Sequence, residues 1–155
     1  MIKILLGLAL IATTTYIGYR FADKYKYRLF VFETLYKFNL TTVSQIGVTN
    51  VSVADGVSLL KKVIPDIMKN ADKFLNGEVF FCEDRRLTAE QKTLVSDYIN
   101  VLGTSDVYNQ KQILNSFGER LNNELLSSKT KCSNFSKLSV RLGFSLGLMI
   151  VVIIM

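Results

Sequence analysis

Few side chains in this chain of 155 residues could support catalysis, because it contains no histidine and only two cysteines, Cys82 and Cys132. Without an imidazole, the commonest general base and metal ligand are absent, as is every Ser–His or Cys–His nucleophile pair. The two cysteines lie far apart in the sequence. A disulfide between them would need an oxidising compartment, and we expect two reduced, half-buried thiols instead.

A second group that could do chemistry is the charged run Glu83-Asp84-Arg85-Arg86. A carboxylate beside a guanidinium can act as an acid–base pair, but charged runs of this kind mostly lie on a solvated surface. The chain also lacks a glycine-rich phosphate loop, which excludes nucleotide binding in the P-loop manner. We therefore predict a protein that is not an enzyme and that holds no cofactor or metal.

The chain begins and ends with apolar runs. Residues 2–20 are predicted to form one transmembrane helix and residues 138–155 a second. An apolar run of about 18 residues is roughly 27 Å long as a helix, close to the hydrocarbon thickness of a bilayer. The second run contains Arg141, after which about 21 Å of uncharged helix remains. This helix would therefore span with Arg141 reaching back to the headgroups, or lie as a tilted or re-entrant segment.

Two other interpretations of the apolar runs stay open. A secretory signal peptide would also begin with a lysine and an apolar stretch, although a basic cluster follows this run and no small-x-small cleavage site ends it. Alternatively, both runs could be buried core helices of a soluble protein.

Basic residues gather where the apolar runs meet the rest of the chain, and this distribution predicts the topology. Residues 29–128 carry 10 basic and 12 acidic side chains, so the net charge of +6 comes from the flanks of the two runs. Basic flanks face the cytoplasm, which places residues 21–137 in the cytoplasm as one domain and excludes a nucleic-acid-binding module. The flanking basic residues are Arg20, Lys24, Lys26, Arg28, Lys129, Lys131, Lys137 and Arg141.

Small residues recur at a spacing of four in both apolar runs. Gly143 and Gly147 form such a pair in the second run, and Thr14 and Gly18 form one in the first. Pairs of this kind allow two helices to approach closely in lipid. We expect Gly143, Gly147 and Gly18 to serve transmembrane packing.

The central domain is predicted to be all-α, since the chain has one proline and little strand-like alternation. The first helix should continue beyond Arg20, with nothing to break it before Gly47. After a turn at residues 49–52, Ser52 with Asp55 should cap a helix through Val63.

Four further helices are expected after this one, and the second of them is short. Pro65 suits the first turn of a helix that carries Met68 and ends at Asn76-Gly77. The segment 78–86 predicts a short helix presenting Phe80 and Phe81, although its Val-Phe-Phe could also be a strand.

Thr88-Ala-Glu-Gln91 is a capping box for a helix that ends at Leu102-Gly103. Ser105 should cap the last helix, which leads without a break into the second apolar run. The result is an antiparallel helical bundle between the N- and C-terminal transmembrane helices.

Three blocks of the sequence carry a family resemblance. They are YINVLGTSDVYNQ (98–110), ATTTYIGYRFADKYKYR (12–28) and RLGFSLGLMIVVIIM (141–155). In their order and spacing they resemble the stage III sporulation protein AB family of endospore-forming bacteria. The resemblance implies a fold similar to the cytoplasmic domain of type II secretion inner-membrane platform proteins.

The resemblance also implies a role, a location and partners. The role is in the channel-forming complex between mother cell and forespore, in the mother-cell membrane around the forespore. The implied partners are a cytoplasmic secretion-type ATPase of the same sporulation operon and other membrane proteins of the complex; a homo-oligomer is also open.

The chain departs from the family pattern at two places. The family typically has acidic residues near the end of the first cytoplasmic helix, where this chain has Thr41 and Val43, and a Thr-Pro pair where it has Thr49-Asn50. If those acids contact the partner, this chain must use other residues for that contact.

The motif residues Leu102, Gly103, Ser105, Asp106 and Gln110 could contact a partner or serve the fold. For Asp106 and Gln110 we favour the structural role, in which Asp106 charges a helix N-terminus and Gln110 makes an interhelical hydrogen bond. The leading function is a non-enzymatic membrane platform or adaptor that couples the ATPase to a trans-envelope channel. The alternative is a membrane-anchored regulatory or sensory bundle, whose signature would be a buried polar pocket.

Overall fold

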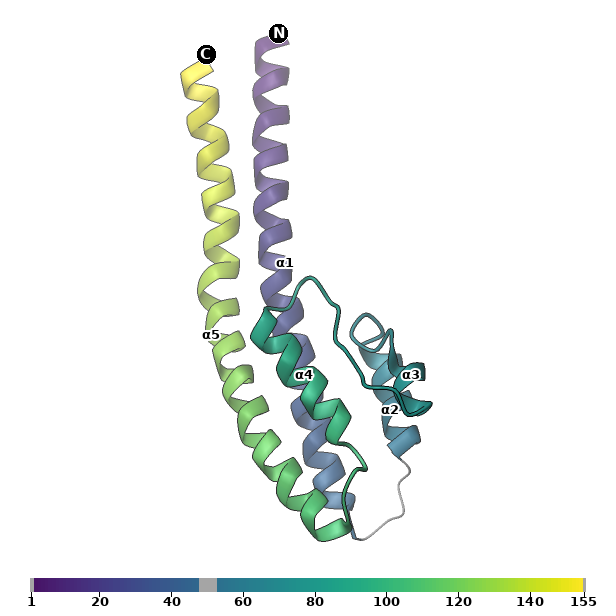
Figure 1. Cartoon of the computed structure of the whole chain (residues 1–155). Coiled ribbons are helices and arrows are strands. Elements are labelled where there is room, and N and C mark those ends of the chain that lie inside the picture. Colours follow the sequence, from purple (N-terminus) through teal and green to yellow (C-terminus); the bar gives the residue numbers. More distant parts are fainter. Residues whose placement is uncertain (1, 48–52, 155) are drawn as a thin grey trace. The chain divides into compact units, whose positions relative to one another are not determined.

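The computed structural model describes residues 2–47 and 53–154, without the side chains of residues 2–6, 8, 10, 136, 137 and 154. Within those ranges the protein is all-α, as predicted, and contains no strand. The helices are α1 (Ile2–Gln45), α2 (Val53–Val63), α3 (Ala71–Leu75), α4 (Ala89–Val101) and α5 (Val107–Ile154) (Figure 1). The expected turn at Thr49-Asn50 and the cap at Ser52 lie outside the described residues.

The chain forms two compact units, and the long helices α1 and α5 contribute to both. One unit, here the helix pair, contains residues up to Phe30 and from Leu126 onward. The other, here the bundle, contains Val31–Leu125. The helix pair therefore extends beyond the two apolar runs and includes the basic flanks that follow residue 20 and precede residue 138.

In the helix pair, α1 and α5 run antiparallel, with the beginning of α1 and the end of α5 at the same end (Figure 1). A Cβ atom placed on Gly18 would lie 2.6 Å from the Ser139 carbonyl oxygen, and one on Gly143 would lie 2.7 Å from the carbonyl oxygen of Thr14. A Cβ on Gly147 would meet the Thr14 hydroxyl. Only glycine permits such a close approach of two backbones, so these residues fix where the helices touch.

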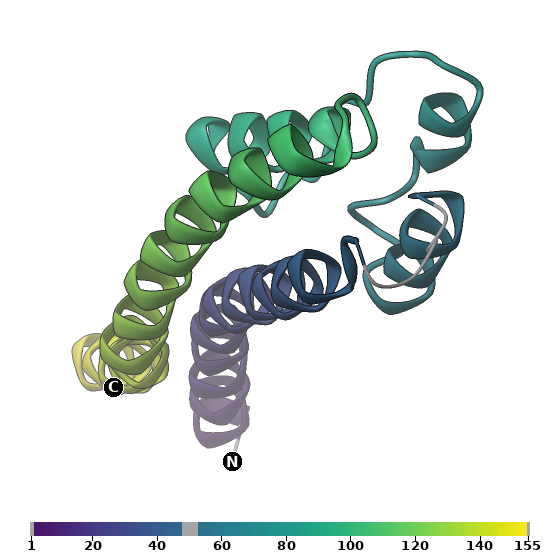
Figure 2. The same cartoon turned by 90° about the horizontal axis from the view of Figure 1, so that it is seen from below.

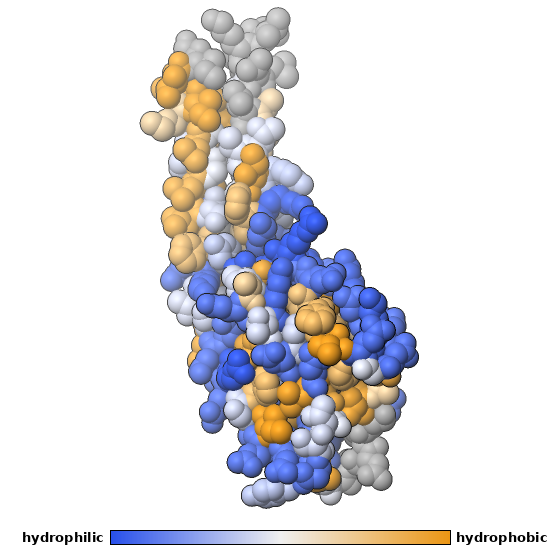
Figure 3. Space-filling view, in the orientation of Figure 1, coloured by the Kyte–Doolittle hydropathy of each residue, from blue (hydrophilic) through white to orange (hydrophobic). Residues whose placement is uncertain are grey.

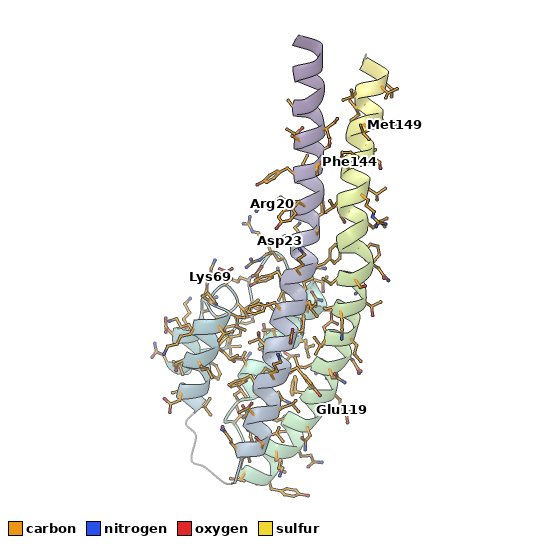
Figure 4. The ribbon with its side chains drawn as sticks, turned by 180° about the vertical axis from the view of Figure 1, so that it is seen from behind. Arg20, Asp23, Lys69, Glu119, Phe144 and Met149 are labelled. Carbon is orange, nitrogen blue, oxygen red and sulfur yellow. The ribbon has the colours of Figure 1, made fainter. Side chains whose placement is uncertain are left out.

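The outward face of α5 in the helix pair is apolar. Phe144 and Met149, which Figure 4 labels, are exposed on α5, and apolar side chains gather along this part of the helix (Figure 3). Among the described residues, α5 is the helix that is long and apolar enough to cross a membrane, by length and composition.

The bundle buries one face of each of its longer helices. Figure 2 shows α4 beside the first turns of α5, and α2 beside the last turns of α1. The Tyr98 ring of α4 packs against Phe117 of α5 with centroids 5.8 Å apart. Residues buried in this core include Val31, Phe32, Leu35, Val57, Leu60, Val95, Ile99, Leu114 and Leu121.

A polar contact joins α1 to α5 inside the bundle. The buried Asn39 amide donates a hydrogen bond to the Leu114 carbonyl oxygen at 3.0 Å. A Cβ on Gly118 would lie 2.7 Å from the same amide nitrogen, so glycine leaves the space that Asn39 occupies. A buried amide is costly without a partner, and this bond therefore favours one register of the two helices.

Two expectations for the middle of the chain were wrong. Pro65 does not open a helix but lies in a turn, where the Met68 N–H donates to the Ile64 carbonyl oxygen at 3.1 Å. The following helix is only α3, which ends where Gly77 adopts a φ of 89°. Ile64, Ile67 and Met68 are all buried, so tertiary packing wins over helix propensity in this turn.

Residues 78–84 are neither the expected helix nor a strand. The backbone of Phe80 pairs instead with the Asn100 side chain, which accepts at 2.7 Å and donates at 3.0 Å, and the Cys82 N–H donates to Ser96 at 2.9 Å. Side chains of α4 thus replace the missing helix or sheet partners of this segment. Phe80 is fully buried, whereas Phe81 is exposed.

The predicted capping box of α4 is confirmed, with Thr88 and Gln91 satisfying each other's backbone N–H groups. The predicted cap of α5 was wrong by one position. Asp106 precedes the first residue of α5, and its carbonyl oxygen accepts from the Gln110 N–H at 2.8 Å. The carboxylate of Asp106 also lies closer to the positive end of the helix than Ser105 does, which favours this start.

The glycine contacts of the helix pair lead to a prediction about Gly18→Ala. The added methyl would meet a backbone carbonyl that cannot move alone, so we expect the free energy of unfolding to fall by about 1–3 kcal/mol relative to Gly7→Ala. Gly7→Ala is the matched control, because its Cβ would meet only a Val151 methyl at 3.3 Å. Thermal unfolding of the full chain in micelles, followed by circular dichroism, measures both, and equal midpoints would contradict the prediction.

Candidate functional site

The predicted motif, Leu102 to Gln110, contains the connection between α4 and α5 and the first turn of α5. Gly103 has a φ of 76°, which allows the chain to turn directly after Leu102. The Gln110 side-chain amide donates to the Val101 carbonyl oxygen at 3.1 Å and so links the end of α4 to α5. Asp106 accepts a hydrogen bond from the Asn109 side chain at 2.5 Å. Asp106 and Gln110 therefore both have contacts within the fold.

Four of the five motif residues line a cavity of about 930 Å³ in the bundle. Leu102, Gly103, Ser105 and Gln110 form one side of it. The last turns of α1 and the length of α2 form the other sides, and Thr41 belongs to that lining. The structure thus brings together the motif and one of the two positions at which the chain departs from the family pattern.

The lining of this cavity combines apolar and polar side chains. Phe38, Leu59, Leu60, Val63 and Leu114 supply the walls. Polar and charged lining residues are Thr34, Lys37, Thr41, Thr42, Gln45, Asp55, Ser105 and Gln110. Among the described lining residues there is one carboxylate, Asp55, and the apolar walls can bind an apolar group. Cavities of this size hold a small ligand or the anchor side chains of a protein partner.

The two α2 residues at the cavity mouth are missing from the set predicted from sequence. Leu59 and Val63 are 55% and 44% exposed, whereas Val57 and Leu60 of the same helix are buried. The signal in the sequence is the width of the apolar stripe of α2, which is broader than its packing on α1 requires. An apolar stripe that no element in residues 2–47 and 53–154 covers indicates a contact surface.

The charged run Glu83–Arg86 forms a structural clamp. Arg86 donates to both oxygens of Asp84, at 3.1 and 2.7 Å, and also to Asp66. The Asp84 side chain is only 5% exposed, so this part of the run is not the solvated surface that its composition indicated. Bidentate pairing holds Arg86 in place and ties the turn after α2 to the segment before α4.

The basic side chains of the α1 flank lie over aromatic rings. The Lys24 ammonium is 5.4 Å from the Phe21 ring centroid, and that of Lys26 is 5.6 Å from Tyr19. The Arg28 guanidinium is 5.8 Å from the Tyr25 ring, which itself stacks on Phe135 of α5. Arg20 and Arg141 are exposed, and the side chain of Lys137 lies outside the described residues.

The predicted site residues thus form three groups. The motif belongs to the bundle, where four of its residues line the cavity. The basic flank and the packing glycines belong to the helix pair. Gly18 lies against Gly143, whereas Gly147 meets α1 nearer the start of the chain, at Thr14.

The chain matches a family model. The model described as stage III sporulation protein AB matches residues 69–155, more than half of the chain. The chain belongs to this family. No curated protein and no solved structure matched it.

Family membership gives the protein a role in sporulation and confirms the resemblance stated from the sequence. The matched segment contains the α4–α5 motif, the clamp at Arg86 and the second apolar run. The block at residues 12–28, which also carried the resemblance, lies outside the matched segment, as do the α1 and α2 walls of the cavity.

Both cysteines of this stage III sporulation AB family member are free thiols in the structure. Cys82 is buried, and its burial raises the pKa of the thiol above the ordinary value. A hydrogen bond with the Asp84 backbone and the positive charge of Lys92 lower the pKa of this thiol, and the negative charges of Asp84 and Glu83 raise it, but burial is the largest effect. Cys132 is only half-buried.

The difference between the two thiols can be tested by alkylation. At pH 8 we expect iodoacetamide to label Cys132 at least about tenfold faster than Cys82, because a buried thiol with a raised pKa has little accessible thiolate. Mass spectrometry of digests at timed intervals gives both rates. In denaturant the rates should converge, and faster labelling of Cys82 in the folded chain would contradict the burial argument.

The position of Asp106 at the start of α5 leads to a second prediction. Asp106→Ala removes both the favourable charge at the helix N-terminus and the acceptor for Asn109, so we expect the free energy of unfolding to fall by about 0.5–2 kcal/mol. Asp106→Asn keeps a capping oxygen and should lose less than half of that. Thermal unfolding of the full chain checks this order, and an Asp106→Ala variant as stable as wild type would refute it.

Proposed function

We propose that this family member is a non-enzymatic platform or adaptor in the membrane, which couples a cytoplasmic secretion-type ATPase to the channel complex between mother cell and forespore. The observation that carries this proposal is the continuity of α1 and α5. Each is a single uninterrupted helix that takes part in both the bundle and the helix pair. Partner binding to the bundle can therefore act on the same two helices that form the apolar pair.

The stiffness of these helices makes such coupling physically reasonable. An α-helix of more than 40 residues keeps its backbone hydrogen bonds throughout and bends only gently unless proline or a similar feature breaks it. The single proline of the chain, Pro65, lies outside α1 and α5. No proline therefore interrupts either helix between its residues in the bundle and its residues in the helix pair.

The charge distribution supports a cytoplasmic bundle in this proposal. Basic residues follow the first apolar run and precede the second, and positive flanks remain on the cytoplasmic side of membrane helices. The bundle would then face the compartment where an ATPase has access to ATP.

The charged run Glu83–Arg86 supports the non-enzymatic part of the proposal. Its Arg86 is paired with two carboxylates, those of Asp66 and Asp84, which limits the acid–base chemistry available to it.

The cavity of the bundle is the surface that we assign to the ATPase. It joins the motif at Leu102–Gln110 with the end of α1, where the family carries acids and this chain has Thr41. Its apolar walls fit apolar anchor side chains of a partner, and its polar lining residues offer hydroxyl and amide groups.

The volume of the cavity, but not the chemistry of its walls, favours a second candidate function. A volume of about 930 Å³ suits a small ligand, as the alternative of a regulatory or sensory bundle requires. The apolar walls around Phe38 and Leu59 differ from the buried polar pocket that this alternative predicts. The two functions separate experimentally, since only the platform needs the ATPase at this site.

Substitution of Leu59 tests the platform function. Leu59→Asp places a charge at the cavity mouth, and we expect co-purification of the sporulation ATPase with the solubilised full chain to fall about tenfold or more, because one buried leucine contributes roughly 1.5–3 kcal/mol. The matched control is Leu75→Asp. Leu75 is a leucine of α3 with 45% exposure that does not line the cavity, and its variant should bind as wild type does.

Both variants are also compared by thermal unfolding, because a folded Leu59→Asp chain is required for this conclusion. Leu59 is half-exposed, so we expect its midpoint to match that of Leu75→Asp. Reproducible absence of the ATPase from wild-type protein would refute the platform function. Equal binding by both variants would refute the assignment to this cavity.

A further inference from the structure

The flank of α1 just beyond the first apolar run combines positive charge with exposed aromatic rings. Arg20, Lys24 and Lys26 lie here with one acidic residue, Asp23 (Figure 4). Among the described ion pairs, none involves Lys24 or Lys26. The rings of Tyr19 and Phe21 are both exposed.

The cations of this flank are directed toward the apolar end of α1. Side chains of an α-helix tilt toward its N-terminus. The contacts agree, because Lys24 lies over Phe21 three residues earlier and Lys26 lies over Tyr19 seven residues earlier. The ammonium groups are thus held at the level where the apolar run ends.

The basic residues of α5 have the opposite direction. Lys129 and Lys131 precede the second apolar run and are exposed. Because α5 enters its apolar run from the N-terminal side, the same tilt points these side chains away from that run. Lys24 and Lys26 of α1 are thus directed toward the apolar segment of their helix, whereas Lys129 and Lys131 are directed away from that of α5.

Ammonium groups beside exposed aromatic rings at the end of an apolar helix fit one chemistry, that of lipid phosphates. Tyrosine rings and lysine stems lie in the interfacial region, where the ammonium group can meet a phosphodiester. Juxtamembrane basic residues attract anionic lipid by about 1 kcal/mol each, which corresponds to about fivefold in affinity.

We infer that residues 19–28 of α1 form a binding surface for the headgroups of anionic phospholipids, and that Lys129 and Lys131 of α5 do not contribute to it. This inference rests on the membrane placement in the proposed function. Headgroups held by Lys24 and Lys26 would fix the depth and rotation of α1 at the bilayer surface.

The test uses the full chain reconstituted in phosphatidylcholine vesicles with spin-labelled phosphatidylglycerol or spin-labelled phosphatidylcholine as probe. The motionally restricted fraction of each probe gives its relative association with the protein. For wild type we expect a preference of at least fivefold for phosphatidylglycerol, which weakens at 1 M NaCl. Lys24→Gln with Lys26→Gln should reduce this preference to below twofold.

The matched control is Lys129→Gln with Lys131→Gln, which removes the same charge from α5 and should keep the wild-type preference. An equal or larger loss in this control would overturn the assignment to α1, as would a wild-type chain without preference. Displacement of the lipid probe by equimolar soluble glycerol phosphate would also overturn it, since the ligand would then be a free anion.

Flotation of the vesicles separates the inference from the function on which it rests. If wild-type protein does not float with neutral vesicles, the membrane placement fails and the inference fails with it. If it floats without lipid preference, only the inference is wrong. Tyr19→Leu supplies a second variant that keeps all charges, and loss of the ring under Lys26 should lower the preference about twofold, whereas Tyr19→Phe should not.

Discussion

The structure depends on close contact between α1 and α5 wherever the two helices meet within a unit. In the helix pair, Gly18 and Gly143 bring each helix within van der Waals distance of the other's backbone. In the bundle, Gly118 leaves room for the Asn39 amide to reach the Leu114 carbonyl oxygen. A contact of this kind tolerates little sliding, because a shift by one turn would place a side chain where a backbone now lies. Small residues, more than apolar bulk, therefore set the register of the two longest helices.

Polar links add to the apolar core in attaching the other elements of the bundle to this frame. Gln91 of α4 caps its own helix through Thr88 and also donates to Glu124 of α5, so one side chain both starts α4 and attaches it. Asn100 and Ser96 of α4 provide the hydrogen bonds of the extended segment before it. Arg86 joins that segment to the turn at Asp66. Such links are directional, and they explain how a segment without secondary structure of its own has a defined path.

The sequence was informative where one local interaction decides the structure. The capping box at Thr88, the glycine stop at Gly103 and the small-residue pairs are such cases, since each depends on residues within about one turn. It was misleading at Pro65 and at residues 78–84, where burial of Ile67, Met68 and Phe80 decides the backbone. The cavity could not be foreseen, because its lining comes from α1, α2 and the α4–α5 connection, and no local pattern relates these three. Only its motif side was marked in advance, by the spacing from Leu102 to Gln110.

The two sides of the cavity differ in their relation to the family. The motif side lies within the matched segment, whereas the sides from α1 and α2 precede it. At Thr41 this chain has a hydroxyl that donates to the Lys37 carbonyl oxygen at 3.0 Å. Asp55 is the carboxylate among the described lining residues, and Leu59 and Val63 are exposed apolar members of the lining. A partner that docked in this cavity would gain more from apolar contact than from charge. Its binding should accordingly depend only weakly on salt, because burial of apolar surface is not screened by ions.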